Sequence, residues 1–257
     1  MIAISLGWGV QSFTLAAMSA LGELPRVDVA IHADTTHEAS GTYAFAAKWT
    51  PWLKERGVRV VTVKNPQPLH ELTSLKTDLP AFTFNGKTNG QLKRQCTSDW
   101  KIAPIKRWLS KELKRQGLKK RPSIVEQWLG ISTDEALRVK PSQVKYITIC
   151  YPLLELGMSR HDCKLWLEAH GLEIPPKSAC VFCPFHDQAE WRELKISGNG
   201  DWEKAVKVDR AIRKARPPYD LFVHSARIPL EEVDVRNLED RGQLRLWDEE
   251  CDGYCGL

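Results

Sequence analysis

An alternation of short apolar segments with helical ones is the feature that most constrains the fold of this chain. The predicted strands cover residues 2–6, 27–33, 58–63, 123–131 and 146–150. Helical patterns over 13–21 and 41–56 separate the first three strands. Strands that alternate with helices form parallel sheets, because each crossover returns the chain to the same edge of the sheet. The sequence therefore predicts an α/β fold with a doubly wound parallel sheet.

The chain divides into two parts of different character. Its 257 residues are enough for one large domain with a smaller appendage. We expect the α/β domain to cover residues 1–175. Residues 176–257 should form a C-terminal helical extension, with a Cys-x-x-Cys knuckle, helices near 188–195 and 202–216, and a cysteine-bearing tail.

The expected cellular location follows from apolar content and cysteine count. No apolar run reaches the length that a bilayer span needs, and the N-terminus lacks the basic flank and long apolar segment of a secretion signal. Seven cysteines, an odd number, argue against a disulfide framework. We therefore expect a cytoplasmic protein with reduced thiols and no membrane partner.

A turn rich in glycine and serine joins the first predicted strand to the first helix. Its sequence is Ser5-Leu6-Gly7-Trp8-Gly9-Val10-Gln11-Ser12. Free amides at a helix start point toward the ligand and form an anion site. Gly7 and Gly9 allow the backbone to approach a phosphate, while Ser5 and Ser12 add hydroxyl donors. The spacing matches neither the dinucleotide fingerprint nor the Gly-x-x-x-x-Gly-Lys-Ser/Thr loop.

Polar residues follow two other predicted strands, where open α/β sheets bind their ligands. Asp34-Thr35-Thr36-His37-Glu38 comes after the second strand, and Ser132-Thr133-Asp134-Glu135 comes after the fourth. Asp34 and Glu38 are candidates for holding magnesium or a ribose. The alternative is that they cap the helix that follows.

Cys180 and Cys183 form a Cys-x-x-Cys knuckle that can bring two thiolates onto one metal. One knuckle cannot complete a tetrahedral site, so Cys96, Cys251 and Cys255 are the candidates for the remaining ligands. The alternatives are a redox dithiol or two thiols without a special role.

Basic residues gather between positions 101 and 121. This stretch contains Lys101, Lys106, Arg107, Lys111, Lys114, Arg115, Lys119, Lys120 and Arg121, against a single acid, Glu112. Such a run indicates either a surface for nucleic acid or other phosphates, or simply a solvated helix face.

Together these motifs resemble the phosphoadenosine-phosphosulfate reductase family, within the adenine nucleotide α-hydrolase-like (PP-loop) superfamily. The resemblance spans most of residues 1–185 and is closest to divergent members commonly found in phages. The turn Ser5 to Ser12 is similar to the family's Ser-Gly-Gly-x-Asp-Ser phosphate loop, although Gln11 stands where the family has Asp. The resemblance implies the fold of that superfamily and binding of ATP or a related adenine nucleotide, with or without magnesium.

Further residues match the family segment by segment. Asp34, Thr35 and Glu38 fall in a segment similar to Asp-Thr-Gly-x-Glu near the nucleotide. Glu135 and Arg138 match the Glu and the last Arg of Gly-x-Arg-x-x-Glu-Ser-x-x-Arg, which implies that Arg138 clamps a phosphate or sulfate.

The stretch from Cys96 to Ile105 resembles Cys-Cys-x-x-x-Lys-x-x-Pro-Leu, with Lys101 at the lysine. In cluster-bearing reductases the Cys-Cys pair of this motif and a later Cys-x-x-Cys together hold a [4Fe–4S] cluster. The resemblance therefore implies Cys96, Cys180 and Cys183 as ligands, while Thr97 replaces the fourth. Either Cys251 or Cys255 closes the site, or an iron position stays open as in thiolases that modify transfer RNA. Zinc is the alternative metal.

The tail Tyr254-Cys255-Gly256-Leu257 is similar to the end of the reductases' Glu-Cys-Gly-Leu-His motif, whose cysteine is the nucleophile. The implied catalytic residues are thus Cys255, Arg138 and Lys101, with a metal-ligand role for the tail cysteines as the alternative. A Cys255 thiolate would attack a sulfonyl sulfur and leave a thiosulfonate on the enzyme.

These features favour an enzyme of sulfur chemistry that binds an adenine nucleotide. It either reduces a sulfonucleotide with a thiol reductant, or uses ATP and a sulfur donor to thiolate a base of transfer RNA or DNA. The alternatives are a catalytically silent nucleotide-binding protein with a structural zinc site, and a plain nucleic-acid-binding module. The sequence does not define an oligomeric state.

Overall fold

Residues 1–65 and 79–236 are described in a computed structural model of the chain. They form two compact units, one from residues 1–80 and 92–181, the other from 81–91 and the chain from residue 182 onward. The division differs from the expected boundary after residue 175 in one main respect. Residues 81–91 belong to the second unit, because their strand pairs with a strand near residue 220.

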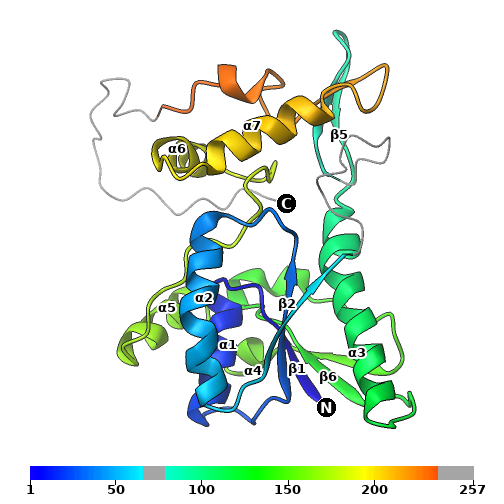
Figure 1. Cartoon of the computed structure of the whole chain (residues 1–257), viewed down its shortest axis with the longest axis vertical. Coiled ribbons are helices and arrows are strands. Elements are labelled where there is room, and N and C mark those ends of the chain that lie inside the picture. The colour runs from blue at the N-terminus through cyan, green and yellow to red at the C-terminus, as the bar shows by residue number, and fades with distance from the viewer. Residues whose placement is uncertain (66–78, 237–257) are drawn as a thin grey trace. The chain divides into compact units, whose positions relative to one another are not determined.

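The first unit is built on a five-stranded parallel sheet with the strand order β3-β2-β1-β6-β7 (Figure 1). Its strands are β1 (Ile2–Ser5), β2 (Val29–Asp34), β3 (Val60–Lys64), β6 (Val125–Trp128) and β7 (Ile147–Cys150). All five lie within or within one residue of the segments predicted as strands. The prediction of an α/β fold with a parallel sheet is confirmed.

Helices cover both faces of this sheet, as a doubly wound fold requires. On one face lie α1 (Val10–Leu21), α2 (Ser40–Glu55), α4 (Pro152–Glu155) and α5 (Arg160–Ala169), and on the other lies α3 (Ala103–Arg115). Successive residues of a strand point to opposite faces. Ile4 therefore packs in the α1 layer against Phe13, whereas Ala3 packs in the α3 layer against Leu109.

Ser159 followed three residues later by Asp162 predicts a helix start from the sequence, and the start of α5 confirms it. The Ser159 hydroxyl accepts a hydrogen bond from the backbone N–H of Asp162, and the Asp162 carboxylate accepts one from the backbone N–H of Ser159. This reciprocal capping box satisfies two N–H groups that the first turn of a helix leaves open. In the described part of the chain, no helix has both the length and the apolar content of a membrane span.

The sequence predicts one basic helix near residues 100–116 with Pro104 in its first turn, whereas the structure forms two elements there. A π-helical turn covers Thr97–Ile102, and α3 begins directly after it. Pro104, which has no N–H to donate, lies in the first turn of α3, as expected. The π-helical turn was not predicted, because its i to i+5 hydrogen bonds leave no simple periodicity in so short a segment.

The second unit combines α6 (Gln188–Ile196) and α7 (Asp201–Ile212) with a three-stranded antiparallel sheet. Its strands, in the order β5-β4-β8, are β4 (Phe82–Phe84), β5 (Asn89–Gln91) and β8 (Asp220–Phe222). Asp209, fully buried on α7, accepts hydrogen bonds from the backbone N–H groups of Val223 at 2.9 Å and Leu230 at 3.1 Å. One buried carboxylate thus ties the helix to the two segments that follow β8.

A buried carboxylate also anchors α3. Glu112 accepts hydrogen bonds from Arg59 at 2.8 Å and from Arg115 at 2.7 and 2.9 Å. The bonds from Arg115, helped by those from Arg59 and Gln116, outweigh burial and lower the pKa of Glu112 to about 2. Arg59 directly precedes β3, so this pair joins the end of α3 to the edge of the sheet.

We expect Glu112→Gln to destabilise the protein at neutral pH by about 1–2 kcal/mol. The full pKa shift would be worth more, but both guanidinium partners are half exposed and screened by water. Because folding lowers the pKa of Glu112 from 4.5, the charge stabilises the fold above pH 4.5 and ceases to do so as the pH falls toward 2.

Urea unfolding at neutral pH and near pH 3 measures this difference. The gap between wild type and Glu112→Gln should shrink at the lower pH, whereas Glu168→Gln, an exposed change on α5, should match wild type at both. A gap of the same size at both pH values would contradict a charge-based role for Glu112.

Candidate functional site

The order of the strands marks one place in the first unit as a binding edge. From β1 the chain continues through α1 to β2 on one side, whereas β6 continues to β7 on the other side. The segments that follow β1 and β6 therefore leave in opposite directions. In doubly wound sheets such a reversal opens a crevice at the carboxyl ends of the two strands, where ligands bind.

The turn after β1 lies at this crevice, and hydrogen bonds of the Ser12 hydroxyl hold it in shape. The backbone N–H of Gly7 donates to the Ser12 hydroxyl oxygen at 3.1 Å, and that hydroxyl donates to the carbonyl of Gly9 at 3.2 Å. Ser178, far along the chain, donates from its hydroxyl to the carbonyl of Gly7. These bonds bring the predicted residues Gly7, Gly9 and Ser12 into one compact turn.

The start of α1 is open for an anion. Its N-cap is Gly9, in extended conformation, and no side chain hydrogen-bonds to the first turn as a cap. The first turn contains no acidic residue either. The backbone N–H groups of this first turn and the positive end of the helix dipole thus face the crevice, and no acidic residue of the turn neutralises them, as an anion-binding turn requires.

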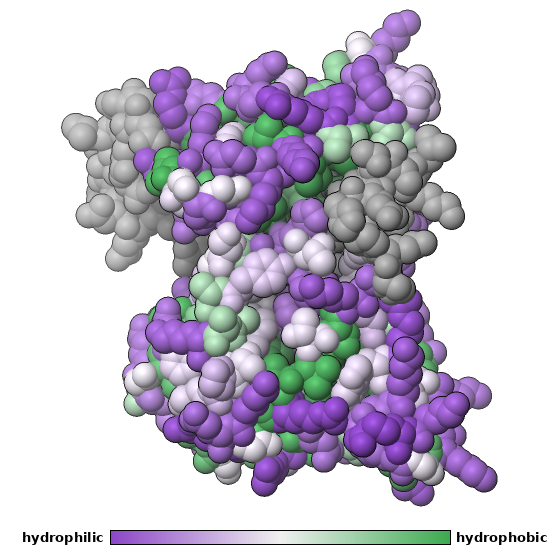
Figure 2. Space-filling model, viewed as in Figure 1, coloured by the Kyte–Doolittle hydropathy of each residue, from purple (hydrophilic) through white to green (hydrophobic). Residues whose placement is uncertain are grey.

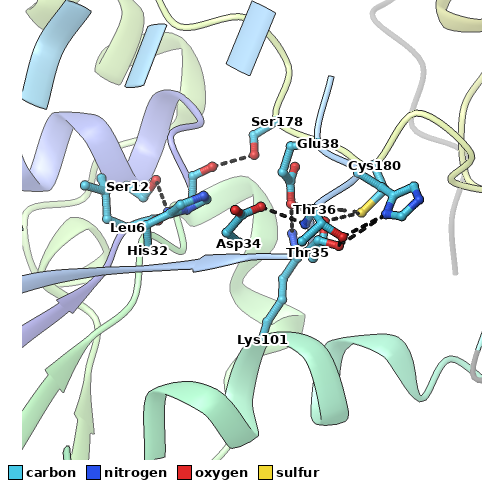
Figure 3. A network of polar contacts seen from close by, with 12 residues as sticks. Leu6, Ser12, His32, Asp34, Thr35, Thr36, Glu38, Lys101, Ser178 and Cys180 are labelled. Atoms are coloured by element: carbon cyan, nitrogen blue, oxygen red, sulfur yellow. Dashed lines mark hydrogen bonds and ion pairs between the residues drawn. The ribbon is translucent and has the colours of Figure 1, made fainter. Parts of the chain in front are cut away.

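Two residues that the sequence did not single out shape this turn. Trp8 adopts a left-handed backbone conformation with φ 59°, which is unfavourable for a bulky residue, and its ring is only 1% exposed. His32 lies on β2, edge-on to that ring, with 6.4 Å between the ring centres. Its Nδ1 lies 3.1 Å from the carbonyl oxygen of Leu6 (Figure 3). Burial lowers the pKa of His32, which keeps the imidazole neutral at neutral pH and suited to donate this bond.

The end of β6 presses directly on the turn. A β-carbon at Gly130 would lie 2.7 Å from the amide nitrogen of Ser12 and 2.9 Å from the carbonyl carbon of Gln11. No ordinary side chain fits there without a backbone shift. Glycine at this position therefore permits the closest contact between the two halves of the crevice.

The loop after β6 brings three of the predicted residues together. The Gln11 amide donates to the hydroxyl of Ser132 at 3.3 Å and to the carboxylate of Glu135 at 3.4 Å. Glu135 also forms an ion pair with Arg138. Ser132, fully buried, was not among the predicted site residues, although it opens the polar segment that follows the fourth predicted strand.

Ser5 is less available than expected. Its hydroxyl accepts a hydrogen bond from the amide of Gln127, on the neighbouring strand β6, at 2.7 Å. Ser5 therefore joins β1 to β6 beneath the crevice. Its hydroxyl can still donate its own proton to one further hydrogen bond.

Asp34 forms a nearly complete polar cluster at the end of β2. Its carboxylate accepts from the Tyr43 hydroxyl at 2.7 Å, from the backbone N–H of Thr36 at 2.7 Å, and pairs with Lys64 at 2.9 Å. Burial works to raise the pKa of Asp34, but these three donors outweigh it and the pKa lies below its ordinary value. The alternative role as a helix cap is not formed, since the N-cap of α2 is Ala39.

Glu38 forms the most deeply buried part of the site, where it is 1% exposed. Its Oε1 pairs with the Lys101 ammonium at 3.1 Å and accepts from the Thr35 hydroxyl at 3.2 Å. Its Oε2 has no hydrogen-bond partner among the described residues. The structure thus brings the predicted residues Thr35, Glu38 and Lys101 into contact around one buried carboxylate (Figure 3).

Cys180 belongs to the same cluster. Its sulfur lies 3.1 Å from the Thr35 hydroxyl oxygen and 4.0 Å from Oε1 of Glu38. The backbones of Glu38 and Cys180 form an isolated antiparallel bridge, and Val181 donates to the carbonyl of His37 at 2.8 Å. The first cysteine of the knuckle is therefore held beside the crevice by backbone pairing.

The predicted metal ligands are distributed over both units. Cys96 and Cys180 belong to the first unit and Cys183 to the second, and all three are half-buried and in no disulfide with a described residue. Within residues 1–65 and 79–236, no group of three or more His, Cys, Asp or Glu side chains has the arrangement of a metal site. The tail residues Cys251 and Cys255 lie outside the described residues, so their predicted roles stay predictions.

We expect Lys101→Met to cost about 3 kcal/mol of unfolding free energy, because it leaves the buried Glu38 carboxylate with a hydroxyl and a weakly donating thiol as its described donors and no cation. Lys64→Met, the matched change on Asp34, should cost about 1 kcal/mol, since a phenol and a backbone amide still hold that carboxylate. Denaturant unfolding of both variants measures the difference.

A second change tests the cause of that loss. Glu38→Gln in the Lys101→Met background removes the uncompensated charge and should restore part of the lost stability. Equal costs for the two lysine variants, or no recovery in the double variant, would contradict the assignment of Glu38 as a buried charge that depends on Lys101.

Comparison with known proteins adds little to the geometry. No family model and no curated protein matches the chain. Among solved structures, it is similar to the crystal structure of phosphoadenylyl-sulfate (PAPS) reductase from Candida auris in a phosphate complex, with 15% sequence identity and a TM-score of 0.43. The match covers 68% of this chain and 74% of that one. A likeness at this level gives no residue of this chain a role.

Proposed function

We propose that this protein is an enzyme of sulfur chemistry that binds an adenine nucleotide at the crevice between β1 and β6. The observation that carries the proposal is the uncapped start of α1 at the point where the strand order reverses. An open helix start at that point suits a phosphate group. The resemblance of the motifs to the sulfonucleotide reductases is the reason for proposing an adenine nucleotide as the ligand and sulfur chemistry as the reaction.

Phosphate binding would use the backbone first and Arg138 second. The amides of the turn donate to the phosphate oxygens, and the hydroxyl of Ser12 keeps the turn in shape. The Arg138 side chain is 62% exposed, and its one ion pair with a described residue is to a half-buried carboxylate, so it can move to a phosphate or sulfate at small cost. Its planar fork matches the two oxygens of such a group.

Gln11 shapes what the site does with a nucleotide. A neutral amide at this position binds Ser132 and Glu135, and it brings no negative charge to a magnesium ion. Asp34 has its donors already in place, which leaves Oε2 of Glu38 as the carboxylate oxygen without a described partner. The site is thus better suited to hold a nucleotide than to cleave it between the α and β phosphates with a metal.

The sulfur chemistry is proposed in two forms. In one, the Cys255 thiolate attacks the sulfonyl sulfur of a sulfonucleotide, the S–O bond to the phosphate breaks and the nucleotide leaves; a thiol reductant then attacks the cysteine sulfur, releasing sulfite and forming a disulfide. In the other, a base oxygen of transfer RNA or DNA attacks ATP and releases pyrophosphate; a sulfur donor then attacks the activated carbon, and AMP leaves with the oxygen. The basic segment from 101 to 121 favours the second form, because a small nucleotide's phosphates need only a few of its charges.

An iron–sulfur cluster remains part of the proposal, but the described residues do not by themselves fit one. Cys180 contacts a hydroxyl and a carboxylate, and no three ligands converge in the described part of the chain. When bound, such a cluster would handle sulfur or electrons.

The alternative function is a catalytically silent nucleotide- or nucleic-acid-binding protein with a structural zinc site. Gln11 favours it, because the residue lacks the charge that metal-assisted nucleotide cleavage would use. A sealed thiolate zinc site would carry no redox chemistry.

Anaerobic purification followed by metal and sulfide analysis separates these functions. Iron with matching sulfide, together with turnover of ATP or of a sulfonucleotide, is the result we expect. One zinc per chain, no visible absorption and no turnover with sulfonucleotide, or with ATP and transfer RNA, would instead identify the silent binding protein.

Gly130→Ala tests the nucleotide site itself. The added methyl must displace the backbone of the turn, since it would lie 2.7 Å from the Ser12 nitrogen. We expect ATP or sulfonucleotide affinity to fall at least about tenfold, equivalent to roughly 1.4 kcal/mol, in isothermal titration calorimetry. Gly41→Ala is the matched control, because its methyl would meet Pro176 at an ordinary 3.7 Å. Equal affinity in both variants would overturn the placement of the nucleotide.

A further inference from the structure

A row of cations runs along the exposed side of α3. Arg107, Lys111 and Lys114 are spaced i, i+4 and i+7, which places them on one face of the helix. The opposite face is apolar and buried, with Leu109 and Leu113 fully enclosed against the sheet. The segment after α3 adds three more exposed cations, Lys119, Lys120 and Arg121.

These charges are not neutralised within the described residues. Between 106 and 121 the chain carries eight cations and one acid, Glu112. Glu112 is buried and bound by Arg115 and Arg59. The structure gives none of the other seven cations an ion pair with a described residue. The outer face of α3 therefore carries uncompensated positive charge, and Figure 2 shows the surface over this helix as mainly hydrophilic.

A groove at the end of α3 adds shape to the charge. It has a volume of about 390 Å³ and is lined by Ser110, Leu113, Lys114, Gly117, Leu118 and Lys120. The Lys120 ammonium also lies 4.9 Å from the centre of the Tyr146 ring, a cation–π contact that holds it at the surface. Two ammonium groups thus line a partly apolar hollow at one end of the row.

We infer that this face, which we call the α3 basic row (Arg107, Lys111, Lys114, Lys119, Lys120 and Arg121), binds the phosphate backbone of a nucleic acid. Charges at i, i+4 and i+7 span about 10 Å along a helix, a length over which one strand of a duplex presents about three phosphates. A membrane surface fits less well. Helices that lie on membranes insert an exposed apolar face, whereas the apolar face of α3 is already packed on the sheet.

The α3 basic row leads toward the candidate site. Lys101, which contacts Glu38, precedes Arg107 by less than two helical turns on the continuous segment formed by the π-helical turn and α3. A nucleic acid bound along α3 would extend toward the carboxyl edge of the sheet. The inference rests on the proposed function in taking the bound polymer as the substrate, and it selects a nucleic-acid base over a small sulfonucleotide.

Charge removal at equal net charge tests the inference. The variant R107Q/K111Q/K114Q removes three charges from the α3 basic row, and K54Q/K164Q/K207Q removes three from other elements. Fluorescence anisotropy with a labelled RNA hairpin and a labelled DNA duplex, over a series of salt concentrations, measures binding to the full chain. We expect the row variant to bind at least about tenfold more weakly and its salt slope to fall by about 2–3. The control should stay within a few-fold of wild type.

The outcomes separate this inference from the proposed function. Three results would overturn the inference. Wild type could bind neither probe, both variants could lose the same affinity, or polyglutamate could displace the probes as well as unlabelled nucleic acid does. Tighter binding of the RNA probe than of the DNA probe, or the reverse, identifies which polymer is bound and supports the inference. Nucleotide titration runs in parallel with ATP. Intact ATP binding without nucleic-acid binding refutes only the α3 basic row, whereas the reverse refutes only the nucleotide site.

Discussion

A backbone contact between the end of β6 and the turn after β1 is the constraint on which the rest of the candidate site depends. The two strands are neighbours, and their continuing segments leave in opposite directions. Only glycine at position 130 allows the backbone of Ser12 to approach so closely. That approach places Ser132 and Glu135 within reach of Gln11, so both sides of the crevice are tied together before any ligand arrives.

Glu38 and Glu135 at this edge each form an ion pair with a cationic side chain. The burial of each pair decides whether a ligand can take over the cation. Glu38 is almost fully buried, so removing its ammonium partner would leave a charge without solvation. Glu135 is 28% exposed and its guanidinium partner 62%, so water can replace that pairing at small cost. A phosphate can therefore take Arg138, whereas Lys101 is held by the fold. Family resemblance alone does not make this distinction.

The sequence predicted the elements whose signals are local and left out those that depend on distant partners. Apolar runs predicted all five parallel strands, and Ser159 with Asp162 predicted a helix start. The short strand Phe82–Phe84 could not be predicted, because three residues carry no period and its partner lies near residue 220. Within the site, strand ends predicted Asp34 and Glu38. The partners of Asp34, Lys64 and Tyr43, come from other elements and carry no motif.

The outer face of α3 carries a cost in stability that its fold role does not explain. Like charges four residues apart on a helix destabilise it by about 0.2–0.5 kcal/mol per pair, and a helix that only needed solubility would alternate signs. Here the one acid is turned inward, where it binds Arg59 and anchors the helix to the sheet. The apolar face and Glu112 with its two arginines dock α3, and the outward cations Arg107, Lys111 and Lys114 have no ion-pair partner among the described residues. Their uncompensated charge fits an external polyanion, and the path of the helix toward Lys101 connects that polyanion with the crevice.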